Sequence, residues 1–137
     1  MKINTFILSF MLLSTTASAS TLIEITKISG KSKEQVASIL GKAIECSKNK
    51  YGMKCSYHMA ETEIVYINGK ADWITVEGID DIPFNKTALK SLGITVTRPI
   101  HKNAYSLRWS NINGIKEVSI FKGEKYSDYA YIKVYTD

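Results

Sequence analysis

The stretch Glu63–Val76, EIVYINGKADWITV, decides the fold of this chain. β-branched and aromatic residues form two strand-like runs in it, Glu63–Ile67 and Ala71–Val76. Asn68-Gly69 separates the two runs, and Asn-Gly favours a type I′ turn because both central positions of that turn need positive φ. The stretch therefore predicts an antiparallel hairpin near the middle of the chain.

Further runs on both sides of this hairpin have a period of two, which is typical of strands. They are Cys55–Met59, Ser106–Ser110, Glu117–Phe121 and Tyr129–Tyr135. The lead-in Leu22–Ile28 is a candidate edge strand. The sequence therefore predicts a sheet built largely from antiparallel neighbours.

Two short helices are expected between the strands. Ser32 is a candidate N-cap with Gln35 three residues later, which completes a capping box, and Gly41 is placed to end this first helix. The second helix is expected to have Asn85 as its N-cap and Gly93 as its stop. The fold class that follows is α+β, an antiparallel β-sheet with short helices packed on one face.

The order of elements suggests an internal repeat. Ser38–Gly41 corresponds to Lys90–Gly93, and Ile64–Gly69 corresponds to Val118–Gly123. Two helix-plus-three-strand units, over residues 28–78 and 79–137, would account for this order. An unrepeated α+β domain with similar turns is the alternative.

Alternation along the strands predicts which side chains face the core. Ala130, Ile132 and Val134 are expected to point toward the helices, as are Ile74 and Val76. Trp73 and Thr75 are expected on the opposite face, with Ile64 as the cross-strand neighbour of Trp73. That face would carry a set of aromatic and charged residues, which is the candidate partner-binding site: Tyr66, Trp73, Tyr129, Tyr131, Lys133 and Tyr135.

The amino terminus has the pattern of a secretory signal peptide. Lys2 supplies a positive charge, Phe6–Leu13 is apolar, and Ala17–Ala19 contains a small-residue cleavage site. Removing the first 19 of the 137 residues leaves 118, enough for a single domain, and lowers the net charge from +5 to +4. The protein is therefore expected to be periplasmic or secreted.

No later run of apolar residues is long enough for a membrane span. The basic residues are scattered along the chain and do not indicate a nucleic-acid partner.

Cys46 and Cys55 are the only cysteines, and both lie in the part expected to be exported. An even count in that location favours a disulfide between them. A redox site would favour two residues between its cysteines, and a zinc site would need three or four ligands. Both remain alternatives to the disulfide, which we expect.

The chain resembles the β-lactamase inhibitor protein fold in three features. They are the capped helix that ends in Leu40-Gly41, the cysteine after that helix and the cysteine in the first predicted strand. The chain is also similar to the small lipoprotein of the outer-membrane β-barrel assembly machinery. The stretch Ile28–Cys55 carries the resemblance by motif, and the rest carries it by element order. It implies an antiparallel sheet with helices on one side and a concave aromatic face that holds another protein. Two features depart from these families: no cysteine stands at the cleavage site, so no lipid anchor is expected, and there is only one cysteine pair.

The inventory of residues does not indicate an enzyme. There is no Gly-x-Ser-x-Gly, no phosphate-binding glycine loop and no His-Glu-x-x-His, so no catalytic residue, cofactor or metal ligand is expected. The leading hypothesis is an exported non-enzymatic protein that binds a protein partner through the aromatic sheet face, as an inhibitor, immunity factor or envelope accessory. The alternative is a small-ligand or glycan binder that uses the same face. A hydrolase is a third hypothesis, and it would need His58 or His101 beside a carboxylate in a pocket.

Overall fold

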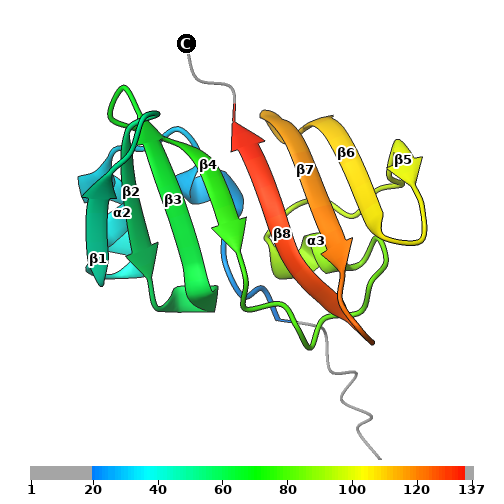
Figure 1. The fold of residues 1–137 in the computed structure, drawn as a ribbon. Coiled ribbons are helices and arrows are strands. Elements are labelled where there is room, and N and C mark those ends of the chain that lie inside the picture. Colours follow the sequence, from blue (N-terminus) through cyan, green and yellow to red (C-terminus); the bar gives the residue numbers. More distant parts are fainter. Residues whose placement is uncertain (1–19, 135–137) are drawn as a thin grey trace, which may run out of the picture.

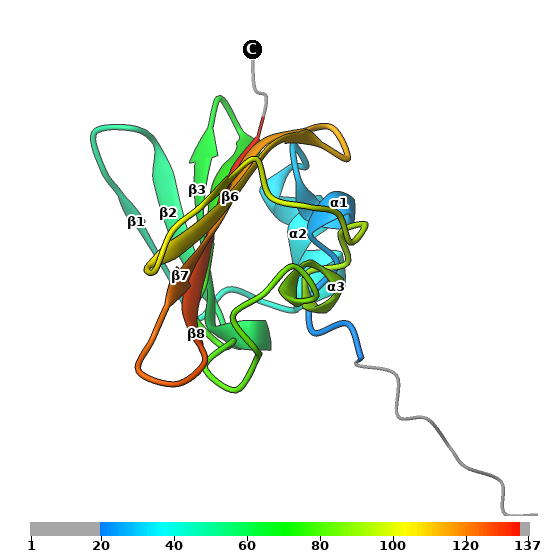
Figure 2. The same cartoon turned by 90° about the vertical axis from the view of Figure 1, so that its right-hand side faces the viewer.

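The computed structural model describes residues 20–134, so the expected signal peptide and Tyr135 lie outside the described residues. Eight strands form one antiparallel sheet, and short helices lie on one side of it (Figures 1 and 2). The strands are β1 (Glu45–Lys48), β2 (Met53–Tyr57), β3 (Thr62–Ile67), β4 (Lys70–Val76), β5 (His101–Lys102), β6 (Ser106–Ile112), β7 (Ile115–Lys122) and β8 (Ser127–Val134). The helical elements are α1 (Ile25–Ile28), α2 (Lys33–Leu40), the 3-10 turn η1 (Met59–Glu61) and α3 (Ala88–Ser91).

The order of strands across the sheet is β1-β2-β3-β4-β8-β7-β6-β5. Each half is a meander of four strands, and the halves join where β4 pairs with β8. The expected units had three strands, because β1 and the two-residue β5 carry too few strand-forming residues to be recognised. The centre of the sheet is therefore the β4–β8 pair, which lies farthest from both edges.

The hairpin that the sequence predicts is confirmed. Asn68 and Gly69 have φ of 51° and 76°, as a type I′ turn requires, and they join β3 to β4. The capping box is confirmed too. The backbone N–H of Gln35 donates to the Ser32 hydroxyl oxygen, and the backbone N–H of Ser32 donates to the side-chain oxygen of Gln35.

Three expectations about local structure are wrong. The lead-in is helical from Ile25 to Ile28 rather than a strand, because helical spacing buries both of these isoleucines completely. Asn85 does not cap α3, which begins after Thr87; the Asn85 side chain accepts the Thr87 amide in the turn before it. The strand expected over Cys55–Met59 is β2, which ends at Tyr57, and the chain then enters η1.

The core lies between the helices and one face of the sheet. Ala130, Ile132, Ile74 and Val76 are fully buried in it and Val134 nearly so, which confirms the predicted alternation. Burial of apolar side chains is the dominant favourable term in folding. No helix within residues 20–134 has the length and apolar character needed to cross a membrane.

Candidate functional site: the aromatic sheet face

The face of the sheet opposite the helices is open, and Figure 1 views the molecule from this side. In the β4–β8 pair, Trp73 lies opposite Lys133 and Thr75 lies opposite Tyr131. Directly opposed residues of an antiparallel pair point to the same face. The expectation that Trp73 and Thr75 point away from the core is therefore confirmed, and Tyr131 and Lys133 join them on the open face.

A β-bulge sets the orientation of Trp73. Without it, the two-residue turn would place Trp73 opposite Ile64, as the simple register predicts. In the structure Tyr66 pairs with Ala71 and Val65 pairs with Trp73, so Asp72 is an extra residue in β4. The insertion moves Trp73 to the face opposite that of Tyr66.

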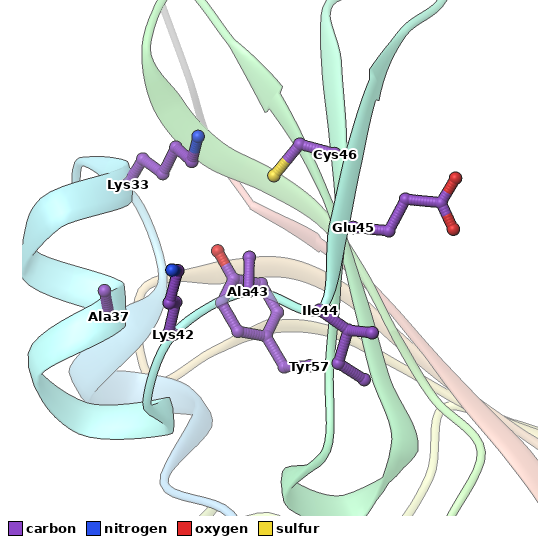
Figure 3. A pocket seen from close by; sticks show the side chains of 8 residues that line it. All are labelled: Lys33, Ala37, Lys42, Ala43, Ile44, Glu45, Cys46 and Tyr57. Atoms are coloured by element: carbon purple, nitrogen blue, oxygen red, sulfur yellow. The ribbon is translucent and has the colours of Figure 1, made fainter.

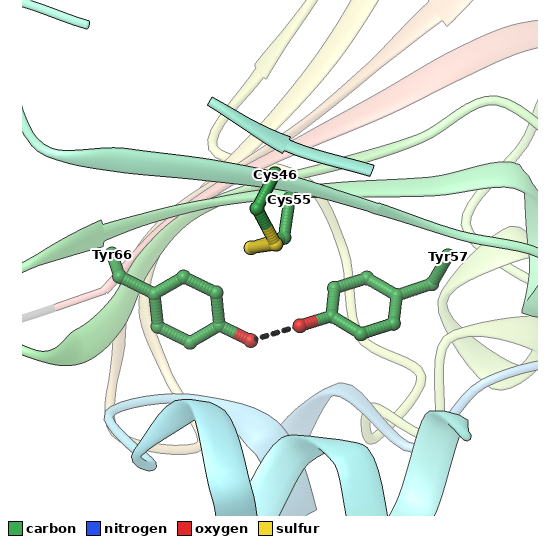
Figure 4. The surroundings of a disulfide bond; sticks show 4 residues. All are labelled: Cys46, Cys55, Tyr57 and Tyr66. Atoms are coloured by element: carbon green, nitrogen blue, oxygen red, sulfur yellow. Dashed lines mark hydrogen bonds between the residues drawn. A yellow bond between two sulfur atoms is a disulfide. The ribbon is translucent and has the colours of Figure 1, made fainter. Parts of the chain in front are cut away.

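The expectation that Tyr66 shares the aromatic face is consequently wrong. Tyr66 is only 4% exposed, and it lies on the helix side of the sheet. Its hydroxyl forms a hydrogen bond of 2.6 Å with the Tyr57 hydroxyl beneath the disulfide (Figure 4). The pKa of Tyr66 is raised by burial, and the Tyr57 hydroxyl and the Glu34 carboxylate raise it further. Tyr66 is thus part of the core and is removed from the candidate site.

The bulge residue Asp72 was not recognised from the sequence, yet it organises the centre of the open face. Its side chain is 1% exposed and accepts a hydrogen bond from the Lys133 ammonium, with which it forms an ion pair. The same ammonium lies 5.6 Å from the centre of the Trp73 ring. One lysine therefore neutralises a buried carboxylate and makes a cation–π contact.

Tyr51 is a second residue that the sequence reading missed. It lies in the β1–β2 turn, and its ring centre is 4.9 Å from that of Trp73. The Asn49 side chain fixes this turn, because its Oδ1 accepts hydrogen bonds of 2.9 Å from the backbone N–H groups of Tyr51 and Gly52. Gly52 is required because a Cβ there would lie 2.0 Å from the carbonyl oxygen of Tyr66.

Further rings extend the aromatic set along β8. The Tyr131 ring centre is 6.4 Å from that of Trp73, and the Tyr129 ring stacks on Phe121 with centres 4.7 Å apart. The pKa of Tyr131 is raised by partial burial and by the nearby carboxylates of Glu117 and Asp72, so its hydroxyl is neutral at physiological pH. From here on, the aromatic face means these five residues: Tyr51, Trp73, Phe121, Tyr129 and Tyr131.

Ion pairs flank the aromatic face. Glu117 pairs with Arg108 at 3.3 Å and accepts the Ser119 hydroxyl at 3.0 Å. On the other half of the sheet, Lys54 pairs with Glu63 at 3.6 Å. Both ion pairs are substantially exposed, and pairs of this kind contribute little to folding stability. They are suited to the polar rim of an interface.

Two buried polar atoms at the centre of the face lack a hydrogen-bond partner among residues 20–134. They are Oδ1 of Asp72 and Nε1 of Trp73. An unpaired buried polar atom costs about 1–3 kcal/mol, and such atoms are uncommon in folded proteins. This cost falls on the two residues that the bulge brings to the open face.

The disulfide between Cys46 and Cys55 is confirmed. The two cysteines are directly opposed in β1 and β2, with Cα atoms 4.1 Å apart (Figure 4). The bond ties the short edge strand β1 to the sheet. It thereby holds both ends of the turn that places Tyr51 over Trp73.

Neither histidine forms the pairing that a hydrolase would need. His58 lines a cavity of about 300 Å³ together with Glu61, Glu63 and Glu77, but no described hydrogen bond or ion pair joins it to a carboxylate. His101 is exposed on the edge strand β5. Within residues 20–134, no group of three or more His, Cys, Asp or Glu side chains is placed to hold a metal ion.

The cavities described for residues 20–134 are not lined by the rings of the aromatic face. The largest, about 490 Å³, lies between α2 and β1, and one of about 450 Å³ lies beside Arg98 and Pro99. One of about 290 Å³ lies beside the Asn68-Gly69 turn. None of the four is lined by Trp73, Tyr129 or Tyr131.

Comparison of the chain with protein-family models, with curated proteins and with solved structures found no match. The functional argument therefore rests on the geometry of the aromatic face.

Proposed function

We propose that this chain is an exported, non-enzymatic binding protein that holds a protein partner on its aromatic face. The partner would be met in the periplasm or outside the cell. The role would be that of an inhibitor, an immunity factor or an envelope accessory. The observation that carries the proposal is the contact series Tyr51–Trp73–Tyr131 at the centre of a sheet face that no helix of residues 20–134 covers.

The composition of this centre matches the energetic centre of protein interfaces. Trp and Tyr are enriched among the residues that dominate binding energy, because they bring a large contact area with few rotatable bonds. The rim of ion pairs around them fits the polar periphery of an interface. The unpaired atoms of Asp72 and Trp73 add support, since departures from full polar satisfaction are expected at functional sites.

A protein partner is favoured over a small ligand because the described cavities do not include these rings. Small ligands are usually held in cavities of about 300–1,000 Å³ that bury most of their surface. A glycan that stacks on Trp73 and Tyr131 is the alternative function. It would need only the exposed faces of the rings, and the experiment below separates the two.

Export is part of the proposal and is supported by the disulfide. Disulfides form and persist in oxidising compartments, and they are rare in the cytosol. The signal peptide over residues 1–19 belongs to the same proposal.

The resemblance to the β-lactamase inhibitor protein fold and to the outer-membrane assembly lipoprotein is likewise a proposal. An antiparallel sheet with helices on one side is the architecture that it implies. We also propose that the two meanders arose by duplication, with β4 and β8 as equivalent last strands. The targets of either family are not transferred to this chain.

An affinity capture from the exported fraction tests the function, with residues 20–137 as bait. The wild type is expected to retain one protein that a Trp73→Ala/Tyr131→Ala variant loses. Loss of a hot-spot residue costs about 2 kcal/mol or more, about 30-fold in Kd. Leu22→Ala/Val96→Ala is the matched control, because both residues are exposed and lie outside the aromatic face. Equal capture by the Trp73 and Tyr131 variant would contradict the proposal, and glycan binding without protein capture would favour the alternative.

A further inference from the structure

The largest described cavity lies on the helix side of the sheet, opposite the aromatic face. Figure 3 shows it between α2 and the edge strand β1, and its volume is about 490 Å³. This volume lies within the range of small-molecule sites. Eight residues line the cavity: Lys33, Ala37, Lys42, Ala43, Ile44, Glu45, Cys46 and Tyr57.

The wall of this cavity is largely apolar. Ala37 comes from α2, Ala43 and Ile44 come from the segment that joins α2 to β1, and Cys46 contributes the disulfide. Ile44 is a large aliphatic side chain that is 54% exposed, so it offers apolar surface at this cavity. The apolar part of a ligand would cover it.

The charges that point into the cavity are positive. Figure 3 shows the ammonium groups of Lys33 and Lys42 between α2 and β1, whereas the Glu45 carboxylate extends to the other side of β1. Neither lysine belongs to an ion pair among the described residues. An anionic group in the cavity would therefore meet two cations without a competing carboxylate from Glu45.

A hydroxyl hydrogen is available at the inner wall. The hydrogen bond between Tyr57 and Tyr66 uses only one of their two hydroxyl hydrogens. Either hydroxyl can be the donor of this bond, and burial raises the pKa of both tyrosines, so both hydroxyls keep their hydrogens at neutral pH. When Tyr66 donates, the Tyr57 hydrogen is left over, and Tyr57 is the member of the pair that lines the cavity. Glu34 lies on the Tyr66 side of the pair, where it contributes to the raised pKa of Tyr66.

We propose that this cavity binds a medium-chain aliphatic carboxylate. Its carboxylate would lie between the Lys33 and Lys42 ammonium groups and accept the Tyr57 hydroxyl, and its chain would lie against Ile44 and the disulfide. A carboxylate fits because it accepts hydrogen bonds from all three donors. A bare inorganic anion would leave the apolar wall uncovered, and a cationic amphiphile would meet two like charges.

Calorimetric titration with decanoate, below its micelle concentration, tests the proposal on residues 20–137. Decanoate is expected to bind with a Kd below about 1 mM, and decyltrimethylammonium is expected not to bind. Lys33→Gln/Lys42→Gln should weaken binding about tenfold or more, since charge-assisted hydrogen bonds are the strong ones. Lys27→Gln/Lys90→Gln removes the same charge from exposed positions elsewhere and should leave the Kd unchanged.

A second variant and an NMR readout locate the site. Tyr57→Phe should weaken decanoate binding severalfold, and amide shifts on titration should concentrate in α2 and β1. The Trp73→Ala/Tyr131→Ala variant should bind decanoate as the wild type does, so this proposal and that of protein binding fail independently. No heat and no shifts at about 1 mM decanoate would overturn the proposal. Equal binding of the cationic amphiphile, or shifts centred on the aromatic face, would overturn it too.

Discussion

The ion pair between Asp72 and Lys133 gives the sharpest test of how the open face is built. Lys133→Met keeps much of the aliphatic stem of the side chain and removes the ammonium, which lies over the Trp73 ring. Asp72 is then left with neither carboxylate oxygen paired, because Oδ1 already lacks a partner among residues 20–134. We therefore expect a loss of folding stability that exceeds the value of an ordinary surface ion pair.

The size of this loss follows from burial. Breaking a fully buried ion pair by removing one partner costs about 3–5 kcal/mol. The Lys133 side chain is 26% exposed while that of Asp72 is 1% exposed, so the pair is only partly screened. We expect a loss of about 2–3 kcal/mol, which corresponds to a fall in Tm of about 8–12 °C for a chain of this size.

Urea unfolding and differential scanning calorimetry measure the loss. Lys122→Met is the matched control, because Lys122 is exposed on β7 outside the described ion pairs and should change stability by less than about 0.5 kcal/mol. Asp72→Asn combined with Lys133→Met should recover part of the loss, since no buried charge remains. A loss below about 1 kcal/mol for Lys133→Met would refute the reasoning that Asp72 depends on this ammonium.

Three further predictions concern the region around the disulfide. Cys46→Ala/Cys55→Ala opens a loop of sequence separation 9 and should cost about 2.6 kcal/mol of folding stability, read from urea midpoints; an unchanged midpoint would contradict it. Gly52→Ala should cost more than about 2 kcal/mol and displace the turn, because its Cβ would lie 2.0 Å from the Tyr66 carbonyl oxygen; a crystal structure with the turn in place would refute this. Because burial raises the pKa of Tyr57 and Tyr66, the unfolded chain ionises first above pH about 10, so this contribution to stability is intact below that pH and is lost as the pH rises. Urea midpoints measured between neutral pH and pH about 11 should show this fall in stability. The variant Tyr57→Phe/Tyr66→Phe should show a smaller dependence on pH.

Local signals in the sequence were sufficient for part of the fold. Asn68-Gly69 and the Ser32–Gln35 capping box act within four residues of chain, so their geometry could be predicted directly. The alternation in β8 could also be predicted, because a sheet covered on one side buries every second residue.

The candidate site was less accessible because it depends on register and on distant contacts. The bulge at Asp72 reverses the orientation of Trp73 relative to Tyr66, and the only local hint is an aspartate within a strand. Tyr51 lies next to lysine in a polar turn, and nothing in that turn indicates that it folds over Trp73. Such contacts are fixed by the pairing of β1 with β2 and of β4 with β8.

Site-specific photocrosslinking tests the central claim most directly. A photoreactive phenylalanine would replace Tyr129 on the aromatic face in one protein and Leu22, which is exposed outside that face, in another. After irradiation in the exported fraction, the account predicts a discrete crosslinked protein from the Tyr129 position and none from Leu22. Crosslinking from Leu22 alone, or none from Tyr129, would contradict the claim that this face holds a protein partner.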